Sequence, residues 1–173
     1  AGPPLRCSLE AMLEAYFAPE LLEATCEQCG AKTARMEKTL SMPPQTLVLH
    51  LKRFVPNCER RCYEKRHQAL EIPLRVRGSP DGLCATTGAS SDAGFDTTTP
   101  GRWYELRAVV SHDGDSPYSG HYVCFARGAD SHWKLYDDSI VHEVGQDFIA
   151  RHDLGRKAYL LFYALEVGTG ALR

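Results

Sequence analysis

The first apolar pattern in the chain has the spacing of one face of a helix. Apolar residues recur with helical period at Leu9, Met12, Leu13, Tyr16 and Phe17. Ser8 stands directly before this stripe and can cap a helix, and Pro19 ends it because proline disfavours helix at the residue before it. The sequence therefore predicts a helix over residues 9–17, with the whole stripe in the core.

Most other apolar runs are short and lie between turn residues, which is typical of strands. Residues 46–54 predict a buried strand with His50 inside the core, residues 59–66 a solvated hairpin, and residues 146–152 a short helix. Further strands are predicted at residues 32–40, 70–76, 104–110, 121–127, 133–136, 140–144 and 158–164. Short strands with helix mostly at the front predict the α+β class, with an antiparallel sheet.

One segment breaks this alternation. Gly, Ser, Thr, Asp and Ala dominate residues 78–102, and no period survives there. We expect a flexible insertion without a functional site, which separates residues 8–77 from residues 103–165. The length of 173 residues otherwise suits one domain.

Charge and cysteine content exclude several classes of protein. Twenty Lys and Arg oppose 22 Asp and Glu, a net charge of −2, so neither a nucleic acid nor a membrane surface is the expected partner. Seven cysteines, an odd number spread through the chain, argue against a disulfide framework. The longest apolar run, residues 159–165, is far shorter than the ~20 residues that cross a bilayer. We expect an intracellular protein, in the cytoplasm or nucleus.

The strongest candidate site pairs a histidine with a carboxylate. His121 follows a polar, glycine-containing segment at residues 111–119, and Asp137 ends the next predicted strand. If the two strands are antiparallel neighbours, the ring and the carboxylate meet. A carboxylate that accepts the Nδ1 proton would leave Nε2 free to take a proton from a nucleophile. A surface histidine beside a turn at residues 137–139 fits the same residues, so the pair alone does not decide.

Several motifs occur together, and in this order they resemble the C-terminal part of a ubiquitin-specific protease catalytic domain. They cover most of residues 8–165 and lie at residues 17–22 before Cys26-x-x-Cys29, 47–54, 104–112, 120–123, 133–139 and 158–163. The resemblance implies a papain-like cysteine protease with thumb, palm and fingers. Residues 1–173 would be the antiparallel fingers and palm part of one catalytic domain, with the thumb lobe mostly missing. The implied reaction is hydrolysis of isopeptide and peptide bonds at the C-terminus of ubiquitin.

The resemblance also implies residue roles. His121 matches the general base, Asp137 the residue that orients it, and Asp138 a neighbour that supports the site in some relatives. The channel for the ubiquitin tail would be flanked by Gly120, Tyr122 and a mobile blocking loop at residues 113–119.

The chain departs from the family at the nucleophile. The family's cysteine lies in a box of the type Asn-…-Gly-Asn-Thr-Cys-Tyr, which these residues do not contain. Cys124, on a predicted strand, is expected in the core. Histidine and aspartate without a thiolate cannot start acyl transfer. We therefore expect a chain that is inactive alone and needs the N-terminal half of the same domain to act on ubiquitin and ubiquitinated proteins. The alternative is a ubiquitin-binding pseudoenzyme.

Cys26 and Cys29 form half of a zinc-binding pattern. A tetrahedral zinc site needs two more ligands. Cys58 and Cys62 offer a Cys-x3-Cys pair, but their charged hairpin is not the family's ligand position. Two interpretations stay open, a structural zinc completed from elsewhere and a pair of reduced thiols. A small zinc protein unrelated to ubiquitin is the third hypothesis for the whole chain. No cofactor is expected for catalysis.

Overall fold

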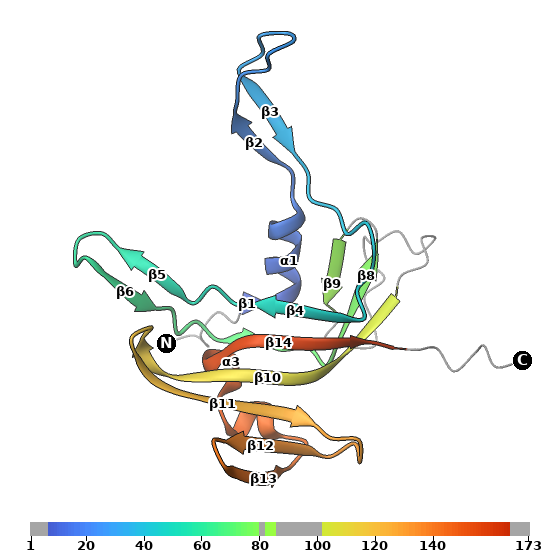
Figure 1. Cartoon of the computed structure of the whole chain (residues 1–173), viewed down its shortest axis with the longest axis vertical. Coiled ribbons are helices and arrows are strands. Elements are labelled where there is room, and N and C mark those ends of the chain that lie inside the picture. The colour runs from blue at the N-terminus through green and yellow to red at the C-terminus, as the bar shows by residue number, and fades with distance from the viewer. Residues whose placement is uncertain (1–6, 80–81, 86–101, 167–173) are drawn as a thin grey trace, which may run out of the picture.

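An eight-stranded antiparallel sheet organises the protein in the computed structural model, which describes residues 7–79, 82–85 and 102–166. Its strands follow the order β13-β12-β11-β10-β14-β4, and β8 pairs with β10 and β9. The long strands β10 and β14 lie in the middle of the molecule, with β12 and β13 along one edge (Figure 1). The bounds are β4 Thr46–His50, β8 Arg75–Ser79, β9 Gly82–Ala85, β10 Arg102–Ser116, β11 Ser119–Arg127, β12 Trp133–Asp137, β13 Ile140–Val144 and β14 Ala158–Leu165.

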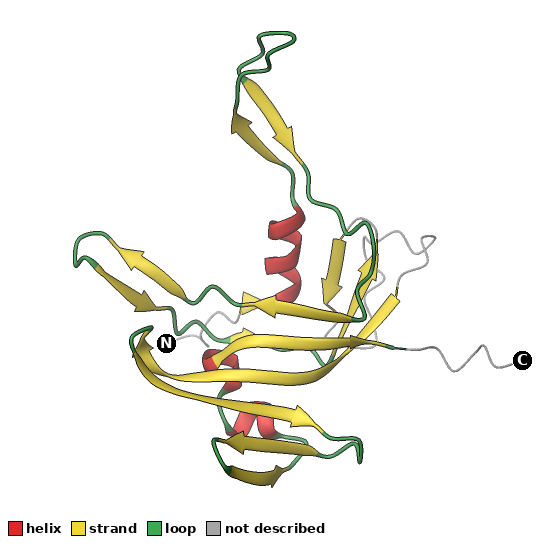
Figure 2. Cartoon of the chain, viewed as in Figure 1, coloured by secondary structure: helices red, strands yellow, loops and turns green. Residues whose placement is uncertain are grey.

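Two hairpins project from this sheet (Figure 1). They are β2 Glu20–Glu23 with β3 Thr33–Met36, and β5 Phe54–Asn57 with β6 Cys62–Lys65. A short parallel pair joins β1 Cys7–Ser8 to β7 Leu70–Glu71. The helices are α1 Leu9–Phe17, α2 Phe148–Arg151 and α3 Leu154–Lys157 (Figure 2). No helix in the described part of the chain is long and apolar enough to cross a bilayer.

Helix α1 has the predicted bounds and cap, because the Ser8 hydroxyl accepts the Ala11 N–H at 3.1 Å. Leu9 and Leu13 are buried. Met12 and Tyr16, however, are 40% and 60% exposed, so their predicted burial is wrong. The described elements cover Leu9 and Leu13 but leave the Met12 and Tyr16 side of the apolar stripe open to solvent.

The segment at 46–54 also differs from its prediction. Only residues 46–50 form a strand, the edge strand β4, which pairs only with β14 among the described strands, and Phe54 begins β5. Alternate side chains therefore face outward, so Val48 is 48% exposed and His50 lies on the surface with its ring 4.6 Å from that of Tyr159. The expectation that His50 belongs to the core is wrong, because it assumed a central strand, whereas β4 lies at the edge of the sheet.

The predicted insertion begins with regular structure. Strand β9 pairs with β8, from Val76 opposite Ala85 to Ser79 opposite Gly82. Strand β10 resumes at Arg102. Residues 80–81 and 86–101 of the predicted insertion lie outside the described residues.

Aromatic side chains fix the strands that carry the candidate site. The Phe148 ring of α2 stacks on Trp133 of β12 at 4.3 Å and on Phe125 of β11 at 5.6 Å. All three side chains are at most 4% exposed. Strands β11 and β12 are therefore packed against one buried cluster, which holds their relative position.

Candidate active site

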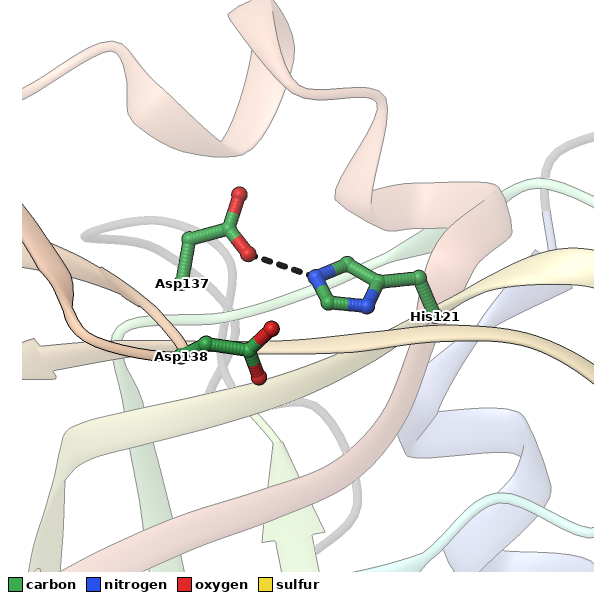
Figure 3. A group of neighbouring side chains, drawn as sticks. All are labelled: His121, Asp137 and Asp138. Carbon is green, nitrogen blue, oxygen red and sulfur yellow. Dashed lines mark hydrogen bonds and ion pairs between the residues drawn. The ribbon is translucent and has the colours of Figure 1, made fainter.

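His121 and Asp137 meet across neighbouring strands. Strands β11 and β12 pair antiparallel, with Cys124 opposite Tyr136 as the last pair toward the site. The His121 ring and the Asp137 carboxylate lie just beyond that pair, and their Nε2 and Oδ1 atoms are 2.5 Å apart (Figure 3). The contact that adjacent strands would produce is therefore present.

The ring nitrogen in this contact is not the expected one. Asp137 holds Nε2, whereas the sequence argument assigned Nδ1 to the carboxylate. Nε2 is the nitrogen farther from the backbone of β11, and it is the one that a side chain from the neighbouring strand reaches. Nδ1 is consequently the nitrogen left to exchange a proton with a nucleophile.

The electrostatic environment favours the protonated ring. The hydrogen bond to Asp137 raises the pKa of His121, and the charges of Asp137, Asp138 and Asp113 act in the same direction. The His121 and Asp137 side chains are 49% and 43% exposed, so a reactant can approach them. An imidazolium held beside a carboxylate can stabilise a neighbouring thiolate.

Asp138 follows in the turn between β12 and β13, with a left-handed φ of 50°. One ligand atom from each of His121, Asp137 and Asp138 lies within 4.8 Å of the others (Figure 3). This group is the largest set of metal-ligand atoms in the described residues, but all three side chains are open to solvent, and such exposed acids are common without an ion. The arrangement fits an acid–base role at least as well.

Gly120 and Tyr122 flank the histidine on β11. Gly120 has a φ of +142°, and a Cβ added there would lie 2.4 Å from His112 Nε2. Tyr122 is 48% exposed, and its ring lies 4.5 Å from the ring of His112. Both residues are accessible beside His121, and their role in a substrate channel stays a prediction.

Most of the segment at 113–119 belongs to paired strands. Strand β10 continues to Ser116 and β11 begins at Ser119, so little more than a turn separates them. Lys157 donates to the Asp113 carboxylate at 2.7 Å, and His67 lies 3.2 Å from that of Asp115. The sequence alone missed this, because the pairing partners come from distant segments.

Two polar residues are buried beneath this turn, and one of them, Lys65, belongs to the segment that was expected to be solvated. Lys65 and His112 are 8% and 1% exposed. The Lys65 ammonium lies 3.2 Å from His112 Nδ1 and donates to the carbonyl of Gly114 at 3.0 Å and to that of His112. Lys65 lies in a charged segment, where no sequence pattern separates a buried lysine from a solvated one.

Among the cysteines whose side chains are described, none is hydrogen-bonded to His121. Cys124 lies on β11 three residues after His121, and burial raises the pKa of its thiol. A raised thiol pKa leaves little thiolate at neutral pH. Cys124 is therefore a poor candidate for the nucleophile, as its predicted structural role implies.

Cys26 and Cys29 lie at the exposed tip of the β2–β3 hairpin. The Cys26 carbonyl accepts from Gly30 N–H at 2.9 Å, and backbone N–H groups of Cys29 and Gln28 lower the pKa of the Cys26 thiol. This turn fits two thiolate ligands of one zinc ion. Within the described ranges no further His, Cys, Asp or Glu completes a ligand group around them, and Cys58 and Cys62 belong to the other hairpin.

Known proteins resemble the chain over nearly its whole length. A profile of the ubiquitin carboxyl-terminal hydrolase family matches residues 14–163. The chain is 33% identical over 166 residues to the probable ubiquitin carboxyl-terminal hydrolase creB of Aspergillus clavatus, and equally to creB of Emericella nidulans. Each alignment covers 90% of the chain and 20% of the relative, so the chain spans about a fifth of the length of these curated relatives.

Solved structures agree. A SAGA module of a Ubp8 variant with Sgf11, Sus1 and Sgf73 superposes with a TM-score of 0.70 at 27% identity, over 92% of the chain and 33% of that protein. The Ubp8 deubiquitinase module bound to ubiquitin aldehyde gives a TM-score of 0.69 at 25% identity, over 92% of the chain and 34% of that protein.

Proposed function

Because the chain belongs to the ubiquitin carboxyl-terminal hydrolase family, we propose that it supplies the general base and its orienting carboxylate to a cysteine-type deubiquitinase. The observation that carries this proposal is the 2.5 Å contact between His121 Nε2 and Asp137, which leaves Nδ1 of an exposed ring available. The substrate would be the isopeptide or peptide bond that follows the C-terminus of ubiquitin. The relative solved with ubiquitin aldehyde supports that substrate class.

In the proposed reaction, Nδ1 of His121 takes the proton of a thiol while Asp137 stabilises the imidazolium. The thiolate attacks the carbonyl carbon of the terminal glycine. The tetrahedral intermediate collapses to a thioester, and the amine leaves with the proton from His121. Water, deprotonated by the same ring, then releases ubiquitin and restores the thiol.

We further propose that the thiol comes from residues outside this chain, so that the chain alone is inactive. Cys124 is held in a partly buried strand with a raised thiol pKa, and none of the cysteines with described side chains is hydrogen-bonded to His121. Met12 and Tyr16 on α1 and Val48 on β4 are exposed apolar side chains, which would be available to dock a thumb lobe supplied from outside the chain. That N-terminal half is the partner we propose.

The decisive experiment reconstitutes the domain. The 173-residue chain is co-expressed with the part of creB that lies outside the matched segment, and a ubiquitin substrate with a C-terminal fluorophore is added. We expect turnover from the complex, loss of turnover with His121→Ala, and full turnover with His142→Ala, an exposed histidine on β13. A complex without turnover, or turnover that survives His121→Ala, would contradict the proposal.

A ubiquitin-binding pseudoenzyme is the second candidate, favoured because none of the cysteines with described side chains is hydrogen-bonded to His121. It predicts that ubiquitin binds to the chain or its complex, by calorimetry, while hydrolysis stays at the background rate. Binding together with turnover would exclude it.

We also propose that Cys26 and Cys29 supply two ligands of a structural zinc ion, closed by two ligands from another segment. The turn and the lowered pKa of the Cys26 thiol support this assignment. Free thiols fit the intracellular compartment that we propose for the protein. One zinc per reconstituted complex, lost with Cys26→Ser but kept with Cys58→Ser, is expected by metal analysis. Equal zinc content in both variants would contradict it.

A further inference from the structure

Lys65 is a buried cation whose contacts are neutral. Its ammonium meets three acceptors, all on β10: His112 Nδ1, the His112 carbonyl and the Gly114 carbonyl. The acids of the nearby turn are paired elsewhere, Asp113 with Lys157 and Asp115 with His67. Burial lowers the pKa of Lys65, which reflects the cost of desolvating its charge. Because burying this charge is costly, the contacts that Lys65 makes with β10 indicate a role other than stabilising the fold.

His112 carries the contact from one strand to the next. Because Nδ1 accepts from the ammonium, the ring proton belongs on Nε2. The ring also interacts with the backbone of Ser119, the first residue of β11, through a hydrogen bond that Nε2 is the nitrogen left to donate. The ring is 1% exposed and packs between Phe54, at 5.4 Å, and Tyr122, at 4.5 Å. Lys65 and His112 thus connect β6, β10 and β11 where β10 turns into β11.

Two glycines make this connection sterically feasible. A Cβ at Gly114 would lie 2.7 Å from the Ser119 carbonyl oxygen, and a Cβ at Gly120 would lie 2.4 Å from His112 Nε2. His121 follows at once and pairs with Asp113 across the strands. Any shift of the turn therefore moves the backbone that carries His121.

We propose that Lys65 is a positioning residue: acting through His112, it fixes the β10–β11 turn and so the backbone of Gly120 and His121. Through Lys65, the β5–β6 hairpin would then stabilise the candidate site without contacting its reacting atoms. This inference rests on the proposed function, in which His121 is the base.

The first test needs no activity. Nitrogen-15 NMR of the unsubstituted chain should show a neutral His112 ring with its proton on Nε2 at neutral pH. In Lys65→Met, which removes the ammonium but keeps most of the side-chain length, that tautomer should no longer be preferred, and amide hydrogen exchange at residues 113–121 should become about tenfold faster or more. Lys52→Met, an exposed lysine in the neighbouring segment, should change neither. A charged ring or an Nδ1 proton in the unsubstituted chain would overturn the proposal, even if Lys65→Met does not fold.

The second test uses the reconstituted complex. We expect Lys65→Met to lower kcat about tenfold to a hundredfold, with a smaller change in KM, since small misplacements of a catalytic group have effects of that size. Adding Lys65→Met to His112→Asn should lower kcat much less than Lys65→Met does alone, because both residues act through the same contacts with the β10–β11 turn. If Lys65→Met keeps full kcat in an active complex, the positioning role is wrong while the proposed function stands. If neither the parent complex nor any variant turns over substrate, the proposed function is wrong. The NMR and hydrogen-exchange measurements then still show whether Lys65 and His112 fix the β10–β11 turn.

Discussion

Gly120→Ala tests the close packing under the candidate site. The new Cβ would lie 2.4 Å from His112 Nε2 and 2.5 Å from the Asp113 carbonyl oxygen, at a φ of +142°. The carbonyl belongs to the paired strand β10, and Lys65 holds the histidine, so the turn itself has to move. The positive φ costs about 1–3 kcal/mol, and the overpacking adds about 1–3 kcal/mol. We expect a loss of about 4 kcal/mol in the free energy of unfolding, or about 8–16 °C in Tm for a chain of this length.

Gly30→Ala is the matched control. Gly30 also has a positive φ, +71°, but an added Cβ there would meet no atom within 4 Å. It should lose only the conformational cost, about 1–2 kcal/mol. Urea denaturation followed by tryptophan fluorescence measures both variants, with an unchanged slope showing that the unfolding transition is comparable. If Gly120→Ala costs no more than Gly30→Ala, the close approach of His112 to the turn is wrong.

Two further changes probe the site and its support. Asp137→Asn should lower the pKa of His121, because the Asp137 hydrogen bond and charge raise it, and an NMR titration measures this directly. A raised folded-state pKa stabilises the folded protein below the unfolded value of about 6.5, and this stabilisation is lost as the pH rises through the folded-state pKa. The difference in urea midpoint between the parent chain and Asp137→Asn should therefore become smaller at alkaline pH. A difference that does not change with pH would contradict this prediction. Arg53→Met should lower the free energy of unfolding, measured by urea denaturation, by about 3 kcal/mol, because the buried guanidinium donates to four backbone carbonyls. Arg35→Met, which removes one partner of an exposed ion pair, should lower it by at most about 1 kcal/mol. Equal losses in the two variants would contradict this prediction.

The parts of the fold that local chemistry determines could be predicted from sequence. Ser8 caps α1 because its hydroxyl lies at the right spacing from Ala11, and the last strand, β14, follows from an uninterrupted apolar run. The meeting of His121 and Asp137 also follows, since both lie at strand ends and the strands pair antiparallel.

The parts that depend on distant segments could not. Burial of the α1 stripe depends on which elements cover it, so Leu13 is buried while Tyr16 is exposed. Lys65 looks like a solvated residue until the turn of β10, 47 positions away, supplies its acceptors. Position along the chain carries no information about such contacts, and only the three-dimensional packing decides them.

The choice of ring nitrogen connects the site to its support. With Asp137 on Nε2, the proton acceptor is Nδ1, which is bonded to Cγ, the ring carbon next to Cβ. Because Asp137 holds Nε2, the ring has little freedom to rotate and realign Nδ1 when the backbone of His121 shifts. Errors in the β10–β11 turn therefore reach the proton-transfer geometry almost undiminished. This makes the contacts of Lys65 and His112 with that turn more important for kcat than their distance from the reacting atoms suggests.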